Sequence, residues 1–265
     1  MIKLHKVNKR YGKFRALADV SLDVKKGDIY GLVGKNGAGK TTIFKAILGL
    51  VRYSGEISIA GSKNSFEFLK NRRKIGFFID SGFFNNLSAR ENLRYYCRLL
   101  GVKNQKAEIQ RVLEVVGLEK VRKRYKSFSM GMKQRLGIAR AILGNPEILI
   151  FDEPANGLDP QGIADIRALM KKLNKDGKTI LISSHILGEL EHTATRFGII
   201  DEGKVLKELQ KNDLKSSTNY VKLKINDLAK AKTALKKAGI KVFGEGLDAT
   251  SLEDYYFELI GGSNV

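Results

Sequence analysis

The chain has 265 residues, enough for one large domain with a small appendage. Its single cysteine, Cys97, excludes an internal disulfide framework and is interpreted as a packing residue. Lysine and arginine outnumber aspartate and glutamate by 48 to 28, and the net charge of +20 favours an anionic partner such as a nucleotide, a nucleic acid or an acidic lipid. No apolar run approaches the roughly 18 residues that span a bilayer, so we expect a cytoplasmic protein, soluble or peripheral to the membrane.

The N-terminal residues alternate apolar and polar side chains, as half-buried strands do, at 2–8 and again at 16–24. The run IYGLV at 29–33 is apolar throughout and is typical of a buried strand in a parallel sheet. Further buried strands are predicted at 147–151, 179–183 and 197–200. Because helical patterns separate these runs, the sequence predicts an α/β fold with a mostly parallel sheet, preceded by an antiparallel β layer.

A glycine-rich segment, GKNGAGKTT, directly follows the strand at 29–33 and matches the P-loop pattern G-x-x-x-x-G-K-[ST]. Glycine is needed there because successive backbone N–H groups turn inward around a phosphate, where a Cβ would obstruct them. We expect Lys40 to hold the β- and γ-phosphates of a nucleotide, Thr41 to ligate Mg²⁺ through its hydroxyl, and Thr42 to reach an adjacent phosphate. The expected phosphate-binding residues are Gly34, Lys35, Asn36, Gly37, Ala38, Gly39, Lys40, Thr41 and Thr42.

Two consecutive helical patterns with no strand between them predict a helical subdomain, at about 80–140, inserted into the α/β core. Ser88 and Glu91 have the spacing of a capping box at the start of the first helix, and Gly101 and Gly117 end the two helices. The expected buried faces consist of Leu93, Tyr96, Leu99 and Leu100 in the first helix, and of Ile109, Val112, Leu113 and Val116 in the second.

The next segment, SFSMGMKQRL at 127–136, places Ser129 and Gly131 before a basic amphipathic stretch. We expect a helix that begins near Met132 or Lys133, whose positive N-terminus can face a phosphate group. The alternative is a helix capped by Ser129 that binds no ligand, as the segment would be in an unpaired chain.

The run ILIFDEPANGLDP predicts a buried strand that ends in two carboxylates, Asp152 and Glu153. Because ligands of parallel sheets bind at the carboxyl ends of the strands, we expect Asp152 to hold Mg²⁺ and Glu153 to act as general base toward an attacking water. His185 follows the next strand and is expected to contact the γ-phosphate.

Taken in order, these motifs resemble the nucleotide-binding subunit of an ATP-binding cassette (ABC) transporter, a P-loop NTPase, over residues 1 to about 212. The resemblance rests on Tyr11 in KRYGKFRAL, the P-loop, the region IGFFIDSGFF at 75–84, SFSMGMKQRL, FDEP, NGLDP with Asp159, and His185. It implies that ATP and Mg²⁺ are the cofactors and that Tyr11 stacks on adenine. It also implies that Ser129, Gly131, Met132 and Asp159 contact ATP held by a second ATPase subunit, in a homodimer.

Three departures qualify the resemblance. Asp80 stands where the family has Gln or Glu, so the resemblance implies a position near Mg²⁺ or the attacking water, but its side chain is one methylene shorter. Lys35 replaces a common proline and adds a charge near the nucleotide. Phe128, Met130 and Met132 replace three residues of the usual L-S-G-G-Q signature. Signatures with GMKQR, like the ending SLEDYYFELIGG, resemble the bacitracin, lantibiotic and multidrug export or immunity class.

The leading hypothesis is therefore an ATPase that powers a separate membrane permease for antibiotic, peptide or drug export, located at the inner face of the cell membrane. The alternative is a non-transport ABC ATPase acting on nucleic acid, motivated by the charge and by KVRKRYK at 120–126. A GTPase-like switch fits poorly because no N-K-x-D motif is present. Anionic headgroups are a further candidate partner for the basic run. Residues 213–265 predict a strand, a helix and a strand, a small C-terminal α+β appendage.

Overall fold

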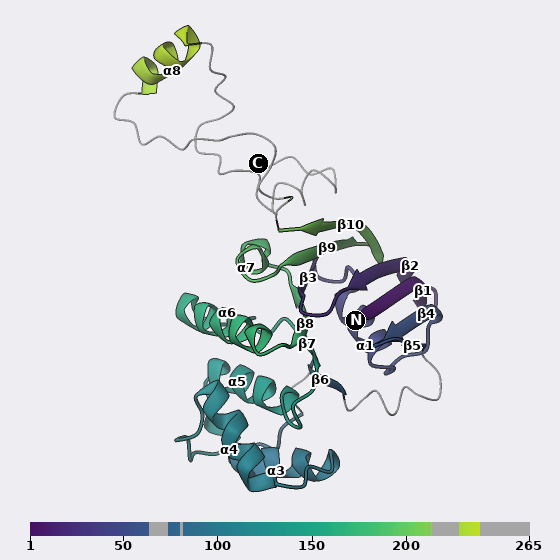
Figure 1. Ribbon diagram of the computed structural model, residues 1–265, viewed down its shortest axis with the longest axis vertical. Helices are drawn as coiled ribbons and strands as arrows, with labels where there is room; N and C mark the ends of the chain where they lie inside the picture. Colours follow the sequence, from purple (N-terminus) through teal and green to yellow (C-terminus); the bar gives the residue numbers. More distant parts are fainter. Residues whose placement is uncertain (64–73, 80–81, 212, 214–227, 239–265) are drawn as a thin grey trace.

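The computed structural model describes residues 1–63, 74–79, 82–211, 213 and 228–238 (Figure 1). The strands are β1 (Ile2–Tyr11), β2 (Phe14–Val24), β3 (Ile29–Val33), β4 (Ser54–Ile59), β5 (Ser62–Lys63), β6 (Ile75–Phe78), β7 (Ile148–Asp152), β8 (Thr179–Ser184), β9 (Arg196–Asp201) and β10 (Lys204–Gln210). The α-helices are α1 (Lys40–Ile47), α3 (Ala89–Leu99), α4 (Gln105–Val116), α5 (Met130–Ala141), α6 (Pro160–Lys175), α7 (Leu187–Glu191) and α8 (Leu228–Lys237). The predicted α/β fold is confirmed.

A four-stranded antiparallel sheet of order β2-β1-β4-β5 forms the N-terminal layer. The two predicted strands form a hairpin, in which Ile2 pairs with Val24 and the chain turns at Gly12, whose φ of 56° lies in the left-handed region. The strand β4 was not predicted from the sequence, because only Ile57 and Ile59 of its six residues are buried. The antiparallel layer is thus confirmed and is wider than expected.

The larger sheet has the order β10-β9-β3-β8-β7-β6 and is parallel except for β10 at its edge. All residues of β3 and β8 are buried, so neither strand alternates between buried and exposed side chains, and the buried residues of β8 include Thr179, Ser183 and Ser184. The edge strands β6 and β10 were not predicted from the sequence, because β10 is mostly exposed and β6 has only four residues. Val33 pairs with Ser184 and Asp152 with Ser183, so the carboxyl ends of β3, β7 and β8 meet at one edge.

The two faces of the larger sheet pack against different layers. Leu149 and Phe151 point toward α5 and α6, whereas Ile148 and Ile150 point toward α1 and the antiparallel sheet. This alternation is the period of two that a strand imposes on its side chains. Figure 1 shows the resulting layers, with the antiparallel sheet on one side of the larger sheet and α3, α4 and α5 gathered at one end.

The helices α3 and α4 form the predicted helical region, and the capping box of Ser88 and Glu91 is present at the start of α3. The buried face of α4 is as expected, but the face predicted for α3 is partly wrong, because Leu99 and Leu100 are 65% and 47% exposed. The core meets α3 along Ala89, Leu93 and Cys97, spaced four residues apart, and Leu99 projects away from that line. Burial raises the pKa of the Cys97 thiol to about 11, which agrees with a packing role.

The helix α5 begins at Met130, two residues earlier than expected, with Ser129 as its N-cap. Its C-terminal half packs unusually closely on β6. A Cβ on Gly137 would lie 2.5 Å from the Phe78 ring, and a Cβ on Gly76 would overlap the carbonyl O of Ala141. Glycine is therefore required on both sides of this contact.

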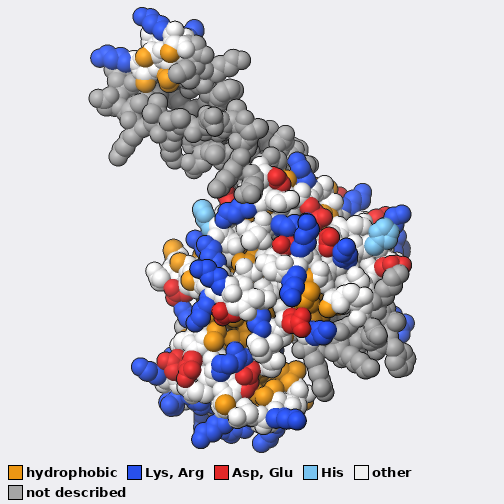
Figure 2. Space-filling model, viewed as in Figure 1, with side chains coloured by type: hydrophobic (Ala, Val, Ile, Leu, Met, Phe, Trp, Pro, Cys, Tyr) orange, Lys and Arg blue, Asp and Glu red, His pale blue; other side chains and the backbone are white. Residues whose placement is uncertain are grey.

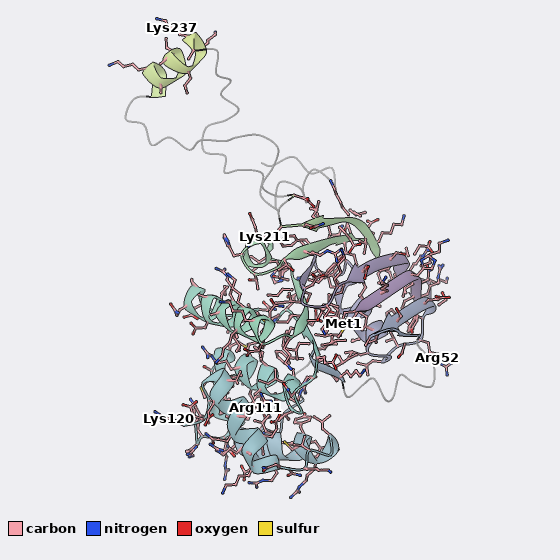
Figure 3. All side chains as sticks on the ribbon, viewed as in Figure 1. Met1, Arg52, Arg111, Lys120, Lys211 and Lys237 are labelled. Atoms are coloured by element: carbon pink, nitrogen blue, oxygen red, sulfur yellow. The ribbon has the colours of Figure 1, made fainter. Side chains whose placement is uncertain are left out.

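Hydrogen bonds from two arginine side chains also connect α4 with α5. Arg111 of α4, labelled in Figure 3, pairs with Glu108 at 2.7 Å and donates a hydrogen bond of 2.9 Å to the carbonyl O of Ile142, just after α5. Arg135 of α5 donates to the carbonyl O of Val116 at 2.9 Å. These charge-assisted bonds make α4 and α5 one packed unit.

Part of the C-terminal prediction falls within the described residues. The expected helix is present as α8, and the two strands expected on either side of it lie outside the described residues. The boundary between 1–212 and 213–265 stays a prediction. Among the described helices, none combines the length and the apolar character needed to cross a bilayer.

Candidate functional site

The segment between β3 and α1 forms a tight loop that packs against two neighbouring strands. Gly37 and Gly39 have φ values of 84° and 111°, which favour glycine. A Cβ on Gly34 would overlap the carbonyl O of Ile200, so β9 also requires glycine there. The carbonyl O of Ala38 accepts a hydrogen bond of 2.9 Å from the N–H of Gly203, which fixes the loop to the β9–β10 turn.

Lys40, the first residue of α1, is only 5% exposed. Its ammonium donates to the carbonyl O of Gly34 at 2.6 Å and to that of Lys35 at 3.2 Å, and it lies 3.4 Å from Oε1 of Glu153. A cation this deeply buried requires partners. The loop thus holds a positive charge directly opposite the carboxylates at the end of β7.

The hydroxyl of Thr41 and the carboxylate of Asp152 meet, with Oγ1 donating to Oδ2 at 2.5 Å. Ser183 Oγ donates to the other carboxylate oxygen, Oδ1, at 2.5 Å. Mg²⁺ prefers oxygen ligands and usually binds one or two carboxylates together with waters and phosphate oxygens. The adjacent oxygens of Thr41 and Asp152 fit that requirement.

Glu153 adopts a left-handed backbone conformation with a φ of 48°, which is uncommon for a residue with a Cβ. The N–H of Glu153 donates to Ser183 Oγ at 3.0 Å, and its Oε2 lies 2.8 Å from Nδ1 of His185. Both side chains keep partial exposure, 21% for Glu153 and 33% for His185. Strained backbone of this kind clusters at functional sites. The structure therefore brings together Lys40, Thr41, Asp152, Glu153 and His185, as the sequence analysis expected.

A pocket of about 250 Å³ connects this cluster to the β1–β2 hairpin. Its lining consists of Tyr11, Phe14, Ala16, Asn36, Gly37, Gly39, Lys40, Thr41, Thr42 and Glu153. Tyr11 is 44% exposed, and Lys9 Nζ lies 4.6 Å from the centre of its ring. One end of the pocket is aromatic and the other is lined by backbone N–H groups, a cation and hydroxyls. This pairing suits a ligand with a planar ring at one end and phosphates at the other.

Two residues of the site were missed in the sequence analysis, and the nucleotide contact expected of Lys35 stays a prediction. Phe14 stands 62% exposed in the same pocket as Tyr11, and a second aromatic residue after the hairpin turn is the signal that could have found it. Ser183 was missed because a serine at a strand end has no distinctive pattern. Lys35 was expected beside the nucleotide; its Nζ lies 3.0 Å from Asp201 Oδ1.

The residues expected to contact a second subunit lie at the N-termini of two other helices. Ser129 caps α5 by accepting a hydrogen bond of 3.3 Å from the N–H of Met132, and Asp159 caps α6 by accepting one of 3.0 Å from Gly162. Gly131 lies in the first turn of α5, where Leu158 would be 3.7 Å from an added Cβ. The pocket that contains Tyr11 and Lys40 includes none of them among its lining residues.

A second cavity of about 600 Å³ lies on the other side of Glu153. Its lining includes Ile79, Met130, Asp152 and Glu153, so it extends from the carboxylates to the start of α5. Asp80, expected in this neighbourhood, lies outside the described residues. Its role stays a prediction.

Replacing Ser183 with alanine should lower the free energy of unfolding by about 1–3 kcal/mol, because the N–H of Glu153 and one oxygen of Asp152 would lose their partner. Urea unfolding monitored by circular dichroism measures the change. Ser127→Ala, at an exposed position, is the matched control and should change it little. An equal loss in both variants would contradict a bridging role for Ser183.

The chain is similar to a known protein family and to several named proteins. A model of the ABC transporter family matches residues 17–156, and a model described as an AAA domain, putative AbiEii toxin of a type IV toxin–antitoxin system, matches the shorter segment 124–191. The bacitracin transport ATP-binding protein BcrA of Bacillus licheniformis is 40% identical over 100% of this chain and 99% of its own length. The lantibiotic transport ATP-binding protein SrtF of Streptococcus pyogenes is 44% identical over 78% of this chain and 90% of its own.

The solved structures that resemble this fold are also ATP-binding cassettes or subunits. The dimeric ATP-binding cassette MJ0796, in a post-hydrolysis state with ADP and phosphate, superposes with a TM-score of 0.72 at 30% identity, over 80% of this chain and 99% of that one. An ATP-binding subunit of an ABC transporter superposes with a TM-score of 0.75 at 28% identity, over 98% of this chain and 99% of that one.

Proposed function

The chain belongs to the ABC transporter family as an ATP-hydrolysing subunit, and from this we propose that it powers a separate membrane permease that exports an antibiotic, peptide or drug. The convergence of Lys40, Asp152 and Glu153 at one sheet edge is the observation that carries the hydrolytic role. The names of the bacitracin and lantibiotic transport relatives support the class of cargo. The alternative of a nucleic-acid ATPase has no comparable support.

We assign the roles within the site as follows. The backbone N–H groups of the loop and the ammonium of Lys40 bind the β- and γ-phosphates, while Tyr11 stacks on the adenine ring. Thr41 and Asp152 would hold Mg²⁺, which would neutralise part of the negative charge of the phosphates. Glu153 accepts a proton from the attacking water, and His185, 2.8 Å away, orients that carboxylate and approaches the γ-phosphate.

A second copy of the chain is proposed to complete each site. Ser129 is exposed at the N-terminus of a helix of 12 residues, whose positive end favours an anion. We propose that Ser129, Gly131 and Met132 meet the γ-phosphate held by the partner's loop, with Asp159 beside them. Asp80 is proposed to lie near Mg²⁺ or the attacking water, on the side of Thr41 and Asp152. The dimeric cassette among the similar structures supports this pairing.

We propose that the permease docks on exposed aromatic side chains at the start of the helical region. Phe84 and Tyr95 are 46% and 42% exposed, and their rings contact each other with centroids 5.0 Å apart. From there, ring contacts of 5.2–5.7 Å continue through Tyr95–Tyr96, Tyr96–Phe83, Phe83–Tyr125 and Tyr125–Phe128. Phe128 immediately precedes Ser129, so the row of packed rings joins the docking surface to the residue proposed to meet ATP.

This function can be tested by expressing the chain with the polytopic membrane protein encoded nearest to it in a sensitive bacterium. We expect copurification from membranes, and resistance to bacitracin-like or lantibiotic peptides only when both proteins are present. Changing Phe84 and Tyr95 together to Asp should remove both effects while ATP hydrolysis by the isolated subunit persists. Leu50→Asp with Leu206→Asp is the matched control, since these leucines are 48% and 40% exposed elsewhere.

Two results would contradict the proposal. One is a chain that copurifies with no membrane protein and changes resistance to none of these compounds. The other is ATP hydrolysis that is stimulated by DNA or RNA and not by the permease, which would favour the nucleic-acid alternative.

A further inference from the structure

We propose that the chain carries a second interaction surface, a basic face of the helical region that binds the headgroups of anionic phospholipids directly. The basic face is defined by nine exposed side chains: Arg94, Arg98, Lys103, Lys106, Lys120, Arg122, Lys123, Arg124 and Lys126. Figure 2 shows Lys and Arg gathered over the end of the molecule formed by α3 and α4, and Figure 3 places Lys120 at its outer edge. This binding requires no permease and so goes beyond the proposed transport function.

The positive charge on this face is concentrated and exceeds the nearby negative charge. Residues 84–126 contain eleven Lys or Arg against four Glu, so about a third of the net charge of +20 lies in about a sixth of the chain. Within the described part of the chain, none of the nine exposed cations forms an ion pair. Of the exposed acids in this segment, Glu91 is occupied by its capping box with Ser88. Like charges held together repel one another, and a polyanionic partner relieves that repulsion.

The backbone holds the basic run in place beside α3. The N–H of Tyr125 donates to the carbonyl O of Leu87 at 2.9 Å, and the N–H of Lys126 donates to that of Asn85 at 3.0 Å. Ser88 and Arg124 form an isolated β-bridge. Residues 124–126 of the basic run are therefore held by backbone hydrogen bonds next to the start of α3. Their positive charges add to those of the cations on α3.

An apolar feature on the same region favours a lipid surface over other polyanions. Leu99 is 65% exposed and Leu100 is 47% exposed, and Arg98 and Lys103 flank them at the end of α3. Exposed leucines beside cations match the membrane interface, where the side chains enter the headgroup region and the charges meet phosphates. Nucleic acid offers phosphates to the cations but no apolar region to the leucines. The observations therefore favour an anionic bilayer over RNA or DNA.

The test uses the full chain and vesicles of phosphatidylcholine, alone or mixed with phosphatidylglycerol, in a sedimentation assay. We expect binding to the anionic vesicles only, with strong weakening as salt rises, because salt screens exposed charges. Each cation near an anionic surface contributes about a fivefold factor to binding, so changing Lys120, Lys123, Arg124 and Lys126 together to Gln should weaken it by about a hundredfold or more. Leu99→Ser with Leu100→Ser should weaken it by about tenfold or more.

The matched control changes four exposed lysines elsewhere, Lys25, Lys26, Lys171 and Lys172, to Gln, which removes the same charge from the other parts of the surface. We expect less than about a threefold effect from it. All variants should keep the ATP hydrolysis rate and circular dichroism spectrum of the parent chain, which separates this test from that of the transport function.

Three outcomes would overturn the proposal. The first is equal weakening by the control variant, which would mean that only the total charge matters. The second is leucine variants that bind anionic vesicles as well as the parent does. The third is a single-stranded oligonucleotide that binds more tightly than the vesicles and is lost in the same four-residue variant, which would assign the face to nucleic acid.

Discussion

Replacing Glu153 with glutamine is expected to abolish ATP hydrolysis, lowering the turnover rate by about a thousandfold, while ATP binding is retained. The amide preserves the size of the side chain and its contact with His185, but it cannot accept the proton of the attacking water. Loss of the negative charge opposite Lys40 also removes a competitor for the phosphates, since Glu153 Oε1 lies 3.4 Å from the ammonium. The variant should therefore accumulate as an ATP-bound dimer.

Phosphate release measures the turnover rate, and size-exclusion chromatography with and without ATP measures the dimer. Glu147→Gln is the matched control, because the same chemical change is made at an exposed residue just before the opposite end of β7. It should hydrolyse ATP at the parent rate. A Glu153→Gln variant that retains more than a small fraction of the activity would rule out the general-base role, and one that elutes as a monomer with ATP would count against shared sites.

Mixing two inactive variants should restore ATP hydrolysis if each site of the dimer is built from both chains, as proposed. Lys40→Ala disables the phosphate loop, and Ser129→Asp places a negative charge at the proposed γ-phosphate contact while keeping a good N-cap for α5. Each variant alone should hydrolyse ATP at less than about 1% of the parent rate. In an equal mixture, about half of the dimers are mixed and each has one site without a defect, so about a quarter of the parent rate should return.

A second mixture makes the comparison decisive. Here a chain that carries both Lys40→Ala and Ser129→Asp is mixed with the unaltered chain. If the sites are shared, each site of a mixed dimer contains one of the two changes and is inactive. Only the unaltered homodimers then contribute, and about a quarter of the rate remains. If each chain formed a site by itself, the first mixture would stay inactive and the second would keep about half of the rate. Ser129→Thr, which retains the hydroxyl, should be active alone.

The fold could be predicted from the sequence wherever the residues of a segment alone indicate its secondary structure and burial. The buried strand β3 and the centre of β8, residues 180–182, form short runs without charged side chains, so their sequences suffice to predict strands. The strands β4 and β10 have few buried residues, and their side chains are too polar to reveal the pairing. The edge strand β6 has only four residues and depends on β7, a partner that is distant in sequence. The exposure of Leu99 has the same origin, because the line of residues that α3 turns toward the core is set by the packing of its neighbours.

In the candidate site too, residues of contiguous motifs could be predicted, and residues placed by strand pairing could not. Lys40, Thr41, Asp152 and Glu153 could be predicted because each belongs to a contiguous motif at a strand end. The bridging hydroxyl of Ser183 could not, since its role comes from the register of β8 against β7, which pairs Asp152 with Ser183. The start of α5 at Met130 rather than at Met132 or Lys133 reflects the side chain of Ser129, which caps the helix locally.

The close contact of β6 with α5 has a mechanical consequence. Because Gly76 lies against the end of α5 and Gly137 lies against the Phe78 ring, we expect this end of the helix to tilt about the contact more readily than it slides along β6. Ser129 lies about 12 Å from Gly137 along the helix axis, so a rotation of about 15° about the contact would carry Ser129 through about 3 Å. A hydrogen bond to a phosphate is made or broken over that distance. In the proposed dimer, we therefore expect a small tilt of the helical region about these two glycines to bring Ser129 toward the second copy's nucleotide or to withdraw it.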